Sequence, residues 1–308
     1  GGSRLDRVPA FDVTLSAPRS VSLVWALGDE ATRAAIETAQ AAAVRQTLEM
    51  LEREAIFARR GRGGERIERV ALTAATFRHG ESRPAEHPDG VIFADPNLHT
   101  HCVVLNLATR SDGSVGALHS TVLRDWKMAA GAFYHAALAA GVTDAGFSLD
   151  RIGKNGTFEI AGIGGDAIQY FSARRREIVE ELAEAGVESG NAAALAAAVA
   201  KTTRAAKTAG SLSREEAWSV AALRIGFDVE ASLSSAAEHE LSGQSPETLL
   251  TERLTALPAR LTETRSVLDR RDLFRVVGEA LVGTGFGAER VETEADRLLA
   301  DGLFVESL

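Results

Sequence analysis

The sequence predicts an α+β fold in which a β-sheet is flanked by α-helices, with a small helical module at the C-terminal end. Runs with the two-residue alternation of β-strands occur mainly in the first half of the chain, among longer stretches with helical spacing. In addition, 45% of the 308 residues are hydrophobic and 25% are charged, which is typical of a folded protein with a real core. The length allows one large domain and a small one.

The composition excludes several classes of protein. No apolar run approaches the roughly 20 residues of a membrane span and no secretory signal is visible, so we expect no membrane insertion. The single cysteine, Cys102, excludes an internal disulfide framework and fits a reducing cytosol. The net charge of −9 does not favour a nucleic-acid binder, but phosphate binding requires only a local basic surface.

The chain begins with a predicted strand and a turn. Residues 11–15 alternate as in a half-buried strand, which places Asp12 on a face beside the polar Thr14. On these residues alone, Asp12 is either an exposed strand residue or a turn partner. Residues 16–20 have turn chemistry and lead toward a helix. Arg19 in this turn either holds a phosphate or is simply solvated.

A long helix is predicted next, over residues 29–60, because apolar residues recur in it near helical spacing. It ends in a segment rich in arginine and glycine that contains Arg62 and Arg66. Such a segment suits contact with single-stranded DNA, through charge and guanidinium stacking. The alternative is a solvated hairpin loop.

Two further β-like runs, 70–79 and 98–105, carry histidines. His99 and His101 are two residues apart, so their side chains point to the same side of a strand. Both faces of that run are otherwise apolar, which predicts a central strand covered on both sides. The earlier run ends in His79.

These histidines are candidate metal ligands. If the two strands pair, three imidazole nitrogens converge. Three neutral imidazoles suit a divalent metal ion and leave coordination positions open for a substrate. The alternative for a His-x-His pair alone is two buried histidines that are satisfied by hydrogen bonds without any metal.

The connection between the two histidine-bearing runs is long. Residues 95–97 read as a turn that delivers the second strand. Residues 84–94 before it form either a small excursion over the site or a hairpin at its rim, and His87 within them reads as a loop histidine and not as a ligand.

The rest of the chain is predicted to be mostly helical. Hairpins are expected around residues 111–113 and 154–156. Ser213 and Glu216 form a capping box at the start of a helix. The three arginines at 174–176 are expected on an exposed helix face. Helices are predicted over residues 125–140, 166–185, 191–208 and 213–226, and a linker over residues 229–248. A small C-terminal module is predicted over residues 249–308, with helices at 266–281 and 289–300 and a strand at 302–305.

Several motifs occur together in an order that resembles the MobF class of conjugative relaxases, the TrwC/TraI type of the HUH endonuclease superfamily. The resemblance covers about residues 8–228, and an ordered set of motifs is far more specific than any single one. The motifs are Phe11–Leu23, Phe77-Arg-His79, Ser82-Arg83, Asp95-Pro-Asn-Leu-His-Thr-His101, Asn106, Arg110–Gly113, Ala130–Tyr134 and Lys154–Phe158.

The resemblance implies a relaxase domain at 1–228 with a central antiparallel sheet of the ferredoxin-like, palm type, flanked by helices. It implies that the module at 249–308 is winged-helix-like and opens a helicase region, although no phosphate-binding loop of an ATPase is present. His79, His99 and His101 become metal ligands, for Mg²⁺ or Mn²⁺ with Zn²⁺ as a further candidate. Asp12 becomes the carboxylate that orients a metal histidine or accepts a proton.

The implied activity is site-specific nicking and strand transfer at an origin of transfer, by a tyrosine that attacks a phosphate held at the metal. We expect Arg19, Arg62, Arg66 and Arg83 to contact the DNA, a hairpin with a single-stranded flank. Relaxosome and type IV coupling proteins are the other implied partners. A monomer in the bacterial cytoplasm is expected, and members of this class are translocated to the recipient cell.

The expected nucleophile is missing from the motifs. Relaxases of this class carry their catalytic tyrosines before the Asp12 strand, whereas this sequence has only Tyr134 and Tyr170, both in segments that match non-catalytic parts. The chain therefore looks like a fragment without its first segment or a natural variant. Covalent cleavage is expected to be absent or weak, which leaves a single-stranded DNA-binding fragment as the alternative function. A third, less favoured hypothesis is an unrelated His-x-His metalloenzyme.

Overall fold

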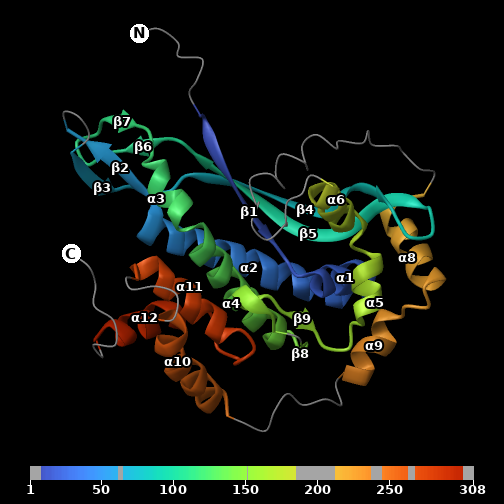
Figure 1. Ribbon diagram of the computed structural model, residues 1–308. Helices are drawn as coiled ribbons and strands as arrows, with labels where there is room; N and C mark the ends of the chain where they lie inside the picture. Colours follow the sequence, from blue (N-terminus) through green and yellow to red (C-terminus); the bar gives the residue numbers. More distant parts are fainter. Residues whose placement is uncertain are drawn as a thin grey trace.

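A three-stranded antiparallel sheet lies at the centre of the molecule (Figure 1). This computed structural model describes residues 8–61, 65–150, 152–184, 212–236, 245–262 and 268–300. The strand order is β1 (Ala10–Ser16), β5 (Ile92–Leu105) and β4 (Ala74–Glu86), so β5 is the central strand. The α+β class and the antiparallel central sheet predicted from the sequence are confirmed.

The two faces of β5 differ. Leu98, Cys102 and Val104 are fully buried on the face that packs against α1 (Arg19–Leu27) and α2 (Glu30–Ala55). Gln40 of α2 donates a hydrogen bond to Thr100 on the same face, at 2.7 Å. The opposite face carries the histidines, and Leu105 on it is 38% exposed. The expectation that both faces are covered is therefore wrong for the described residues, because these helices pack on one side only.

Strands β4 and β5 form one long hairpin. The expected turn at 95–97 is wrong, because these residues lie inside β5, and Asp95 is fully buried. The chain reverses instead at residues 87–91, where Gly90 has a φ of 78° that favours glycine. Residues 84–94 are thus the hairpin that was one of the two expected alternatives. The register of the pair shifts between His79 and Glu81 and again before Pro84.

Two small hairpins lie side by side at one end of the sheet (Figure 1). The helix expected over 29–60 ends earlier, because buried Ile56 takes an extended conformation and the chain continues as a strand. A bridge between Ala58 and Leu118 joins the two hairpins. The elements are α1 (Arg19–Leu27), α2 (Glu30–Ala55), β2 (Phe57–Arg60), β3 (Arg66–Arg69), β6 (Ala108–Thr109) and β7 (Val115–Gly116).

The described middle of the chain has the expected helices and hairpins, except that one expected helix is divided into two. The helix expected over 166–185 is two helices, and the capping box of Ser213 with Glu216 is confirmed. The helix expected over 191–208 lies outside the described residues. The elements are α3 (Ser120–Asp125), α4 (Lys127–Asp144), β8 (Leu149–Asp150), η1 (Lys154–Gly156), β9 (Glu159–Ile160), α5 (Gly165–Tyr170), α6 (Ala173–Glu184), α8 (Arg214–Arg224) and α9 (Val229–Ala236).

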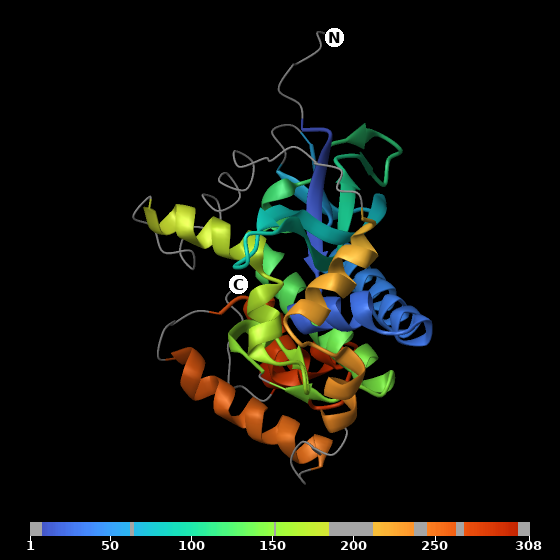
Figure 2. The same ribbon diagram turned by 90° about the vertical axis from the view of Figure 1, so that its right-hand side faces the viewer.

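Three helices complete the described fold, namely α10 (Pro246–Thr262), α11 (Arg270–Leu281) and α12 (Arg290–Ala300). The linker expected over 229–248 is wrong for its first part, because α9 forms there and buries Val229. Helices α10 to α12 lie on the side of α4 away from the sheet (Figure 2) and share its hydrophobic core. The approach of α11 to α4 is close, since a Cβ at Gly278 would lie 3.0 Å from the carbonyl carbon of Ala132.

The strand expected over 302–305 lies outside the described residues, so the winged-helix-like character of the module stays a prediction. None of the helices in the described part of the chain has the length and the apolar content needed to cross a membrane.

Candidate metal centre

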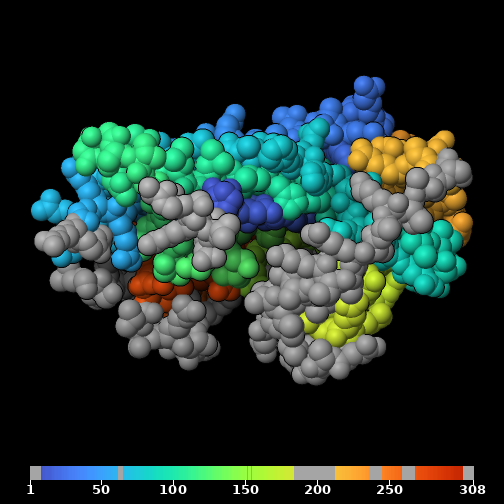
Figure 3. All heavy atoms as spheres, turned by 90° about the horizontal axis from the view of Figure 1, so that it is seen from above, coloured from blue at the N-terminus to red at the C-terminus, as the bar shows by residue number. Residues whose placement is uncertain are grey.

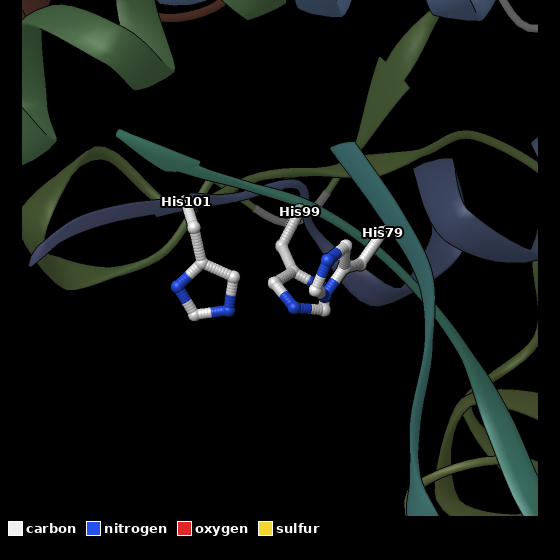
Figure 4. A group of neighbouring side chains, drawn as sticks. All are labelled: His79, His99 and His101. Carbon is white, nitrogen blue, oxygen red and sulfur yellow. The ribbon is translucent and has the colours of Figure 1, made fainter. Parts of the chain in front are cut away.

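Three imidazole rings converge on the open face of the sheet (Figure 4). His99 and His101 come from β5, and His79 on β4 is the direct cross-strand partner of His99. One ring nitrogen from each residue lies within 4.8 Å of the other two. The ring centroids are 5.1–5.3 Å apart. The predicted convergence of the three histidines is confirmed, and their role as ligands is taken up below as a proposal.

His99 is prepared to act as a neutral ligand. It is 9% exposed, and burial lowers its pKa, with further lowering by the neighbouring His101 and His79. Its Nδ1 donates a hydrogen bond to the backbone carbonyl of Asn97 at 2.8 Å. The amide nitrogen of the Asn97 side chain lies 3.1 Å from the same Nδ1. In the tautomer that donates to the carbonyl, the proton is on Nδ1 and the lone pair on Nε2 is free.

His101 is oriented by the carboxylate of Asp12. Its Nδ1 lies 2.8 Å from Oδ2 and 3.0 Å from Oδ1 of Asp12, which stands on the neighbouring strand β1. The hydroxyl of Thr14 lies 3.1 Å from the same nitrogen. A carboxylate accepts a proton from Nδ1, so Nε2 of His101 also keeps its lone pair. This contact fits the orienting role that the sequence motif implied for Asp12.

The donor set fits a divalent metal ion. Two nitrogens on one tetrahedral zinc ion lie about 3.4 Å apart, because each Zn–N bond is about 2.0–2.1 Å long. The candidate nitrogens lie within 4.8 Å of one another. From separations within this limit, the rings reach the spacing of a zinc site by moving inward by at most on the order of 1 Å. Three protein ligands leave at least one coordination position for a substrate oxygen.

The histidines open into a cavity of about 780 Å³. Four arginines outside the triad contribute to its wall, namely Arg78 and Arg83 of β4, Arg174 of α6 and Arg214 of α8. Arg83 is exposed, whereas Arg174 is only 7% exposed, so the expectation that all of residues 174–176 are exposed is wrong at its first position. The chain as a whole carries a net charge of −9, whereas the wall of this cavity holds four arginines beside the two carboxylates of Glu37 and Glu81.

The four arginines predicted to contact DNA have different positions. Arg83 lines the cavity, and Arg66 is exposed on β3 in the hairpin at the end of the sheet. Arg62 lies outside the described residues. Arg19 is half-buried at the start of α1, where its guanidinium donates to the backbone carbonyl of Pro96. Burial lowers its pKa, while Asp95 and Glu159 oppose that effect, so Arg19 has an internal structural role instead of an exposed phosphate-binding one.

Neither tyrosine contributes to the wall of this cavity. Tyr134 is 1% exposed within α4, and burial raises its pKa. Tyr170 donates a hydrogen bond to Asp89 at 3.0 Å, and burial followed by this contact raises its pKa. A phenol with a raised pKa is a weaker nucleophile at neutral pH, so neither residue is arranged to attack a phosphate at the triad.

His87 is not the loop histidine that the sequence suggested. It is 2% exposed, and its Nε2 lies 2.9 Å from Oδ1 of Asp95. Its ring stacks on Phe93 at a centroid distance of 3.6 Å. His87 therefore ties the hairpin turn to β5, and the expectation that it is no metal ligand agrees with its partners.

Sequence reasoning missed two features that build the site. Asn97 was interpreted as turn chemistry, although its carbonyl fixes the proton of His99. Gly80, directly after His79, lies where the register shifts and where Trp25 packs against the strand. A glycine inside a predicted strand often marks a bulge, and that signal could have found Gly80.

The fold and the site define the class, a protein with three imidazoles and an orienting carboxylate on the open face of an antiparallel sheet. The model of the TrwC relaxase family matches residues 2–224. The chain belongs to the TrwC relaxase family, as the motifs predicted. It is 30% identical over 253 residues to the multifunctional conjugation protein TraI of Escherichia coli. The aligned region covers 77% of this chain and 13% of TraI.

Solved structures of similar proteins support the same family. The structure of TrwC complexed with a 27-mer DNA that comprises the recognition hairpin and the cleavage site matches with a TM-score of 0.61 and 34% identity, over 74% of this chain and 78% of that one. A metal-bound structure of TrwC with oriT DNA matches with a TM-score of 0.61 and 35% identity, over 74% and 76%. The chain nevertheless spans only about a tenth of the curated TraI relatives.

Proposed function

We propose that this chain is the DNA-nicking and strand-transfer domain of a conjugative relaxase, acting on single-stranded DNA at an origin of transfer. The observation that carries the proposal is the cluster of His79, His99 and His101, with Asp12 on the outer nitrogen of His101. Three neutral ligands leave the positive charge of a bound ion available to a phosphodiester. One similar TrwC structure contains a 27-mer DNA with the recognition hairpin and the cleavage site, and another is metal-bound with oriT DNA.

Different residues of the chain have different roles in the proposed reaction. A bound metal ion would polarise the scissile phosphate and stabilise charge in its transition state. Asp12 holds the proton on Nδ1 of His101, which keeps Nε2 directed to the site. Arg83 in the cavity wall attracts the phosphate backbone, and exposed Arg66 on β3 is a second phosphate contact in this proposal. Arg62, which lies outside the described residues, is a further candidate.

The metal in this proposal is Mg²⁺ or Mn²⁺, with Zn²⁺ as the further candidate. Imidazole donors suit Zn²⁺, whereas Mg²⁺ and Mn²⁺ prefer oxygen ligands. Phosphate oxygens and water would supply oxygen ligands in the open positions. Comparing the affinities of the three ions in the presence and absence of DNA decides among them.

A second function is favoured by the positions of the tyrosines. Tyr134 is buried in α4 and Tyr170 is held by Asp89, so the described chain offers no phenol at the triad. A chain that binds DNA without cleaving it fits this arrangement, and the attacking tyrosine would then come from a segment outside it. In the nicking function, the tyrosine attacks the scissile phosphate and forms a 5′-phosphotyrosine bond, while a 3′-hydroxyl leaves. The reverse attack rejoins the strand.

The wider setting of the proposal is bacterial conjugation. The domain would act as a monomer in the cytoplasm of the donor, with relaxosome and type IV coupling proteins as partners, and pass into the recipient. In this proposal residues 1–228 are the relaxase domain and residues 249–308 open a helicase region, with residues 229–248 between them. The contact of α11 with α4 supports including the C-terminal helices in any fragment used for assays.

The test is binding of a fluorescent hairpin oligonucleotide with a single-stranded flank, with and without added Mn²⁺. We expect tight binding by the chain as it stands and loss of one bound metal ion in His101→Ala. We expect Arg83→Ala to weaken DNA binding by about 5- to 10-fold, the size of a lost phosphate contact. The matched control is Arg45→Ala, which removes an exposed arginine from α2 on the covered side of the sheet.

The result separates the two functions. A covalent adduct that forms only when a tyrosine-bearing segment is added supports the nicking domain with an external nucleophile. An adduct on Tyr134 or Tyr170 would contradict our assignment of both residues as structural. Equal metal content in the unaltered chain and in His101→Ala would refute the metal site.

A further inference from the structure

Phe77 is an exposed aromatic residue beside the histidine cluster. It precedes His79 by two residues on β4, so both side chains point to the same face of the strand. Its direct cross-strand partner on β5 is His101. Despite its size, Phe77 is 52% exposed. An aromatic ring therefore stands open to solvent on the face that holds the three imidazoles.

Single exposed apolar residues are common on protein surfaces, so exposure alone carries no argument. The position of Phe77 is more informative, because its direct cross-strand neighbour on this face is His101 and the next residue of β4 on the face is His79. Asp12 and Thr14 of β1 contact His101 from its other side. Figure 3 looks down from above in the orientation of Figure 1 and shows atoms of β4 and β5, in cyan to teal, reaching the surface. The open face thus presents one large aromatic ring next to polar ligands.

The spacing suits one nucleotide. Two residues along a strand span about 7 Å, which separates Phe77 from His79. A phosphate held between the three imidazoles has its attached sugar and base within that distance. Nucleic-acid-binding proteins commonly stack unpaired bases on exposed aromatic rings on open sheets, independently of the base sequence.

We propose that Phe77 stacks on the base of a nucleotide that flanks the phosphate held at the histidine cluster. The inference rests on the proposed function and adds a specificity to it. Only an unpaired base can leave its neighbours and lie flat on the ring, so Phe77 makes the site selective for single-stranded DNA at the position of cleavage. Phe77 acts on substrate binding and leaves the metal ligands unchanged.

The experiment compares Phe77→Ala and Phe77→Trp with the unaltered chain. Each protein is titrated with the hairpin oligonucleotide and with a series in which one nucleotide at a time around the cleavage position is abasic. We expect Phe77→Ala to bind the intact strand about 5- to 150-fold more weakly, the range for loss of one base stack, while Phe77→Trp retains binding. On the oligonucleotide that lacks the stacked base, Phe77→Ala and the unaltered chain should bind equally.

Two controls make the result specific. Ile92→Ala removes another apolar side chain of the same sheet that is 61% exposed, and it should bind DNA normally. Metal affinity should be the same in Phe77→Ala and the unaltered chain, which excludes distortion of the histidines. A loss in Phe77→Ala that is equal on every abasic oligonucleotide, or no loss at all, would overturn the inference. Failure of the unaltered chain to bind any oligonucleotide would overturn the proposed function and this inference together.

Discussion

The indole ring of Trp25 closes over Gly80 so tightly that a Cβ at residue 80 would lie 2.2 Å from its Cη2 atom. Gly80 directly follows His79, at the point where the register of β4 against β5 shifts. Trp25 is itself fixed, because its indole N–H donates to Glu37 at 2.9 Å and its ring meets Trp218 edge-on at 5.9 Å. The glycine is therefore a steric requirement of the strand segment that carries His79.

Gly80→Ala should displace the strand beside His79. We expect a loss of about 1–3 kcal/mol in the free energy of unfolding, as for other overpacked positions, and a decrease of about 10-fold in metal affinity. Chemical denaturation measures the free energy of unfolding, and titration calorimetry measures the metal affinity.

Two further variants test the cause. Trp25→Phe removes the outer ring atoms that a new Cβ would meet, so the double variant Gly80→Ala/Trp25→Phe should regain metal affinity relative to Gly80→Ala alone. Gly164→Ala is the matched control, since nothing lies within 4 Å of the Cβ that it adds. Unchanged metal binding in Gly80→Ala would show that His79 does not depend on this contact.

Asp12→Asn should weaken metal binding without unfolding the chain. The amide oxygen can still accept a hydrogen bond from His101, but it lacks the charge that raises the basicity of the ring, and half of the Asp12 side chain is exposed. Loss of such an orienting carboxylate typically decreases metal affinity by about 10- to 100-fold. Isothermal titration calorimetry with Mn²⁺ and Zn²⁺ measures this decrease in metal affinity. Asp112→Asn on the small hairpin is the control. Affinity equal to that of the unaltered chain would show that Asp12 does not orient His101.

The thiol of Cys102 should be inert in the native protein. Burial raises the pKa of this thiol to about 11, whereas an unburied thiol titrates at 9.0. The unfolded chain therefore releases this proton between about pH 9 and 11 while the native chain keeps it, so stability contributed by Cys102 is present below pH 9 and decreases as the pH rises. The difference is on the order of 2 kcal/mol at pH 11.

A disulfide-exchange reagent should accordingly label Cys102 slowly at pH 8 in buffer and rapidly in denaturant. Unfolding curves at pH 8 and pH 10 for the unaltered chain and Cys102→Ala isolate the contribution of this thiol from other titrating groups. Rapid labelling of the native protein would contradict the buried position of Cys102.

The sequence was sufficient for the strand alternation that aligns His99 with His101, because that pattern depends only on local geometry. It was insufficient for Asp95 and Arg19, whose side chains are buried against segments far away in the chain. It also placed the end of the long helix several residues late, because the start of β2 is decided by its pairing with β3 and not by apolar spacing. The contact of Trp25 with Gly80 is likewise a tertiary one that no local pattern records.

Helices α11 and α4 meet with almost no space between their backbones at Gly278 and Ala132. The motifs of the relaxase family end before α11 begins, yet the two helices share one apolar interior. A gene cut where the motifs stop would leave the buried side of α4 facing water, so we expect the smallest stable fragment to extend past the last recognisable motif and to include residues 270–281.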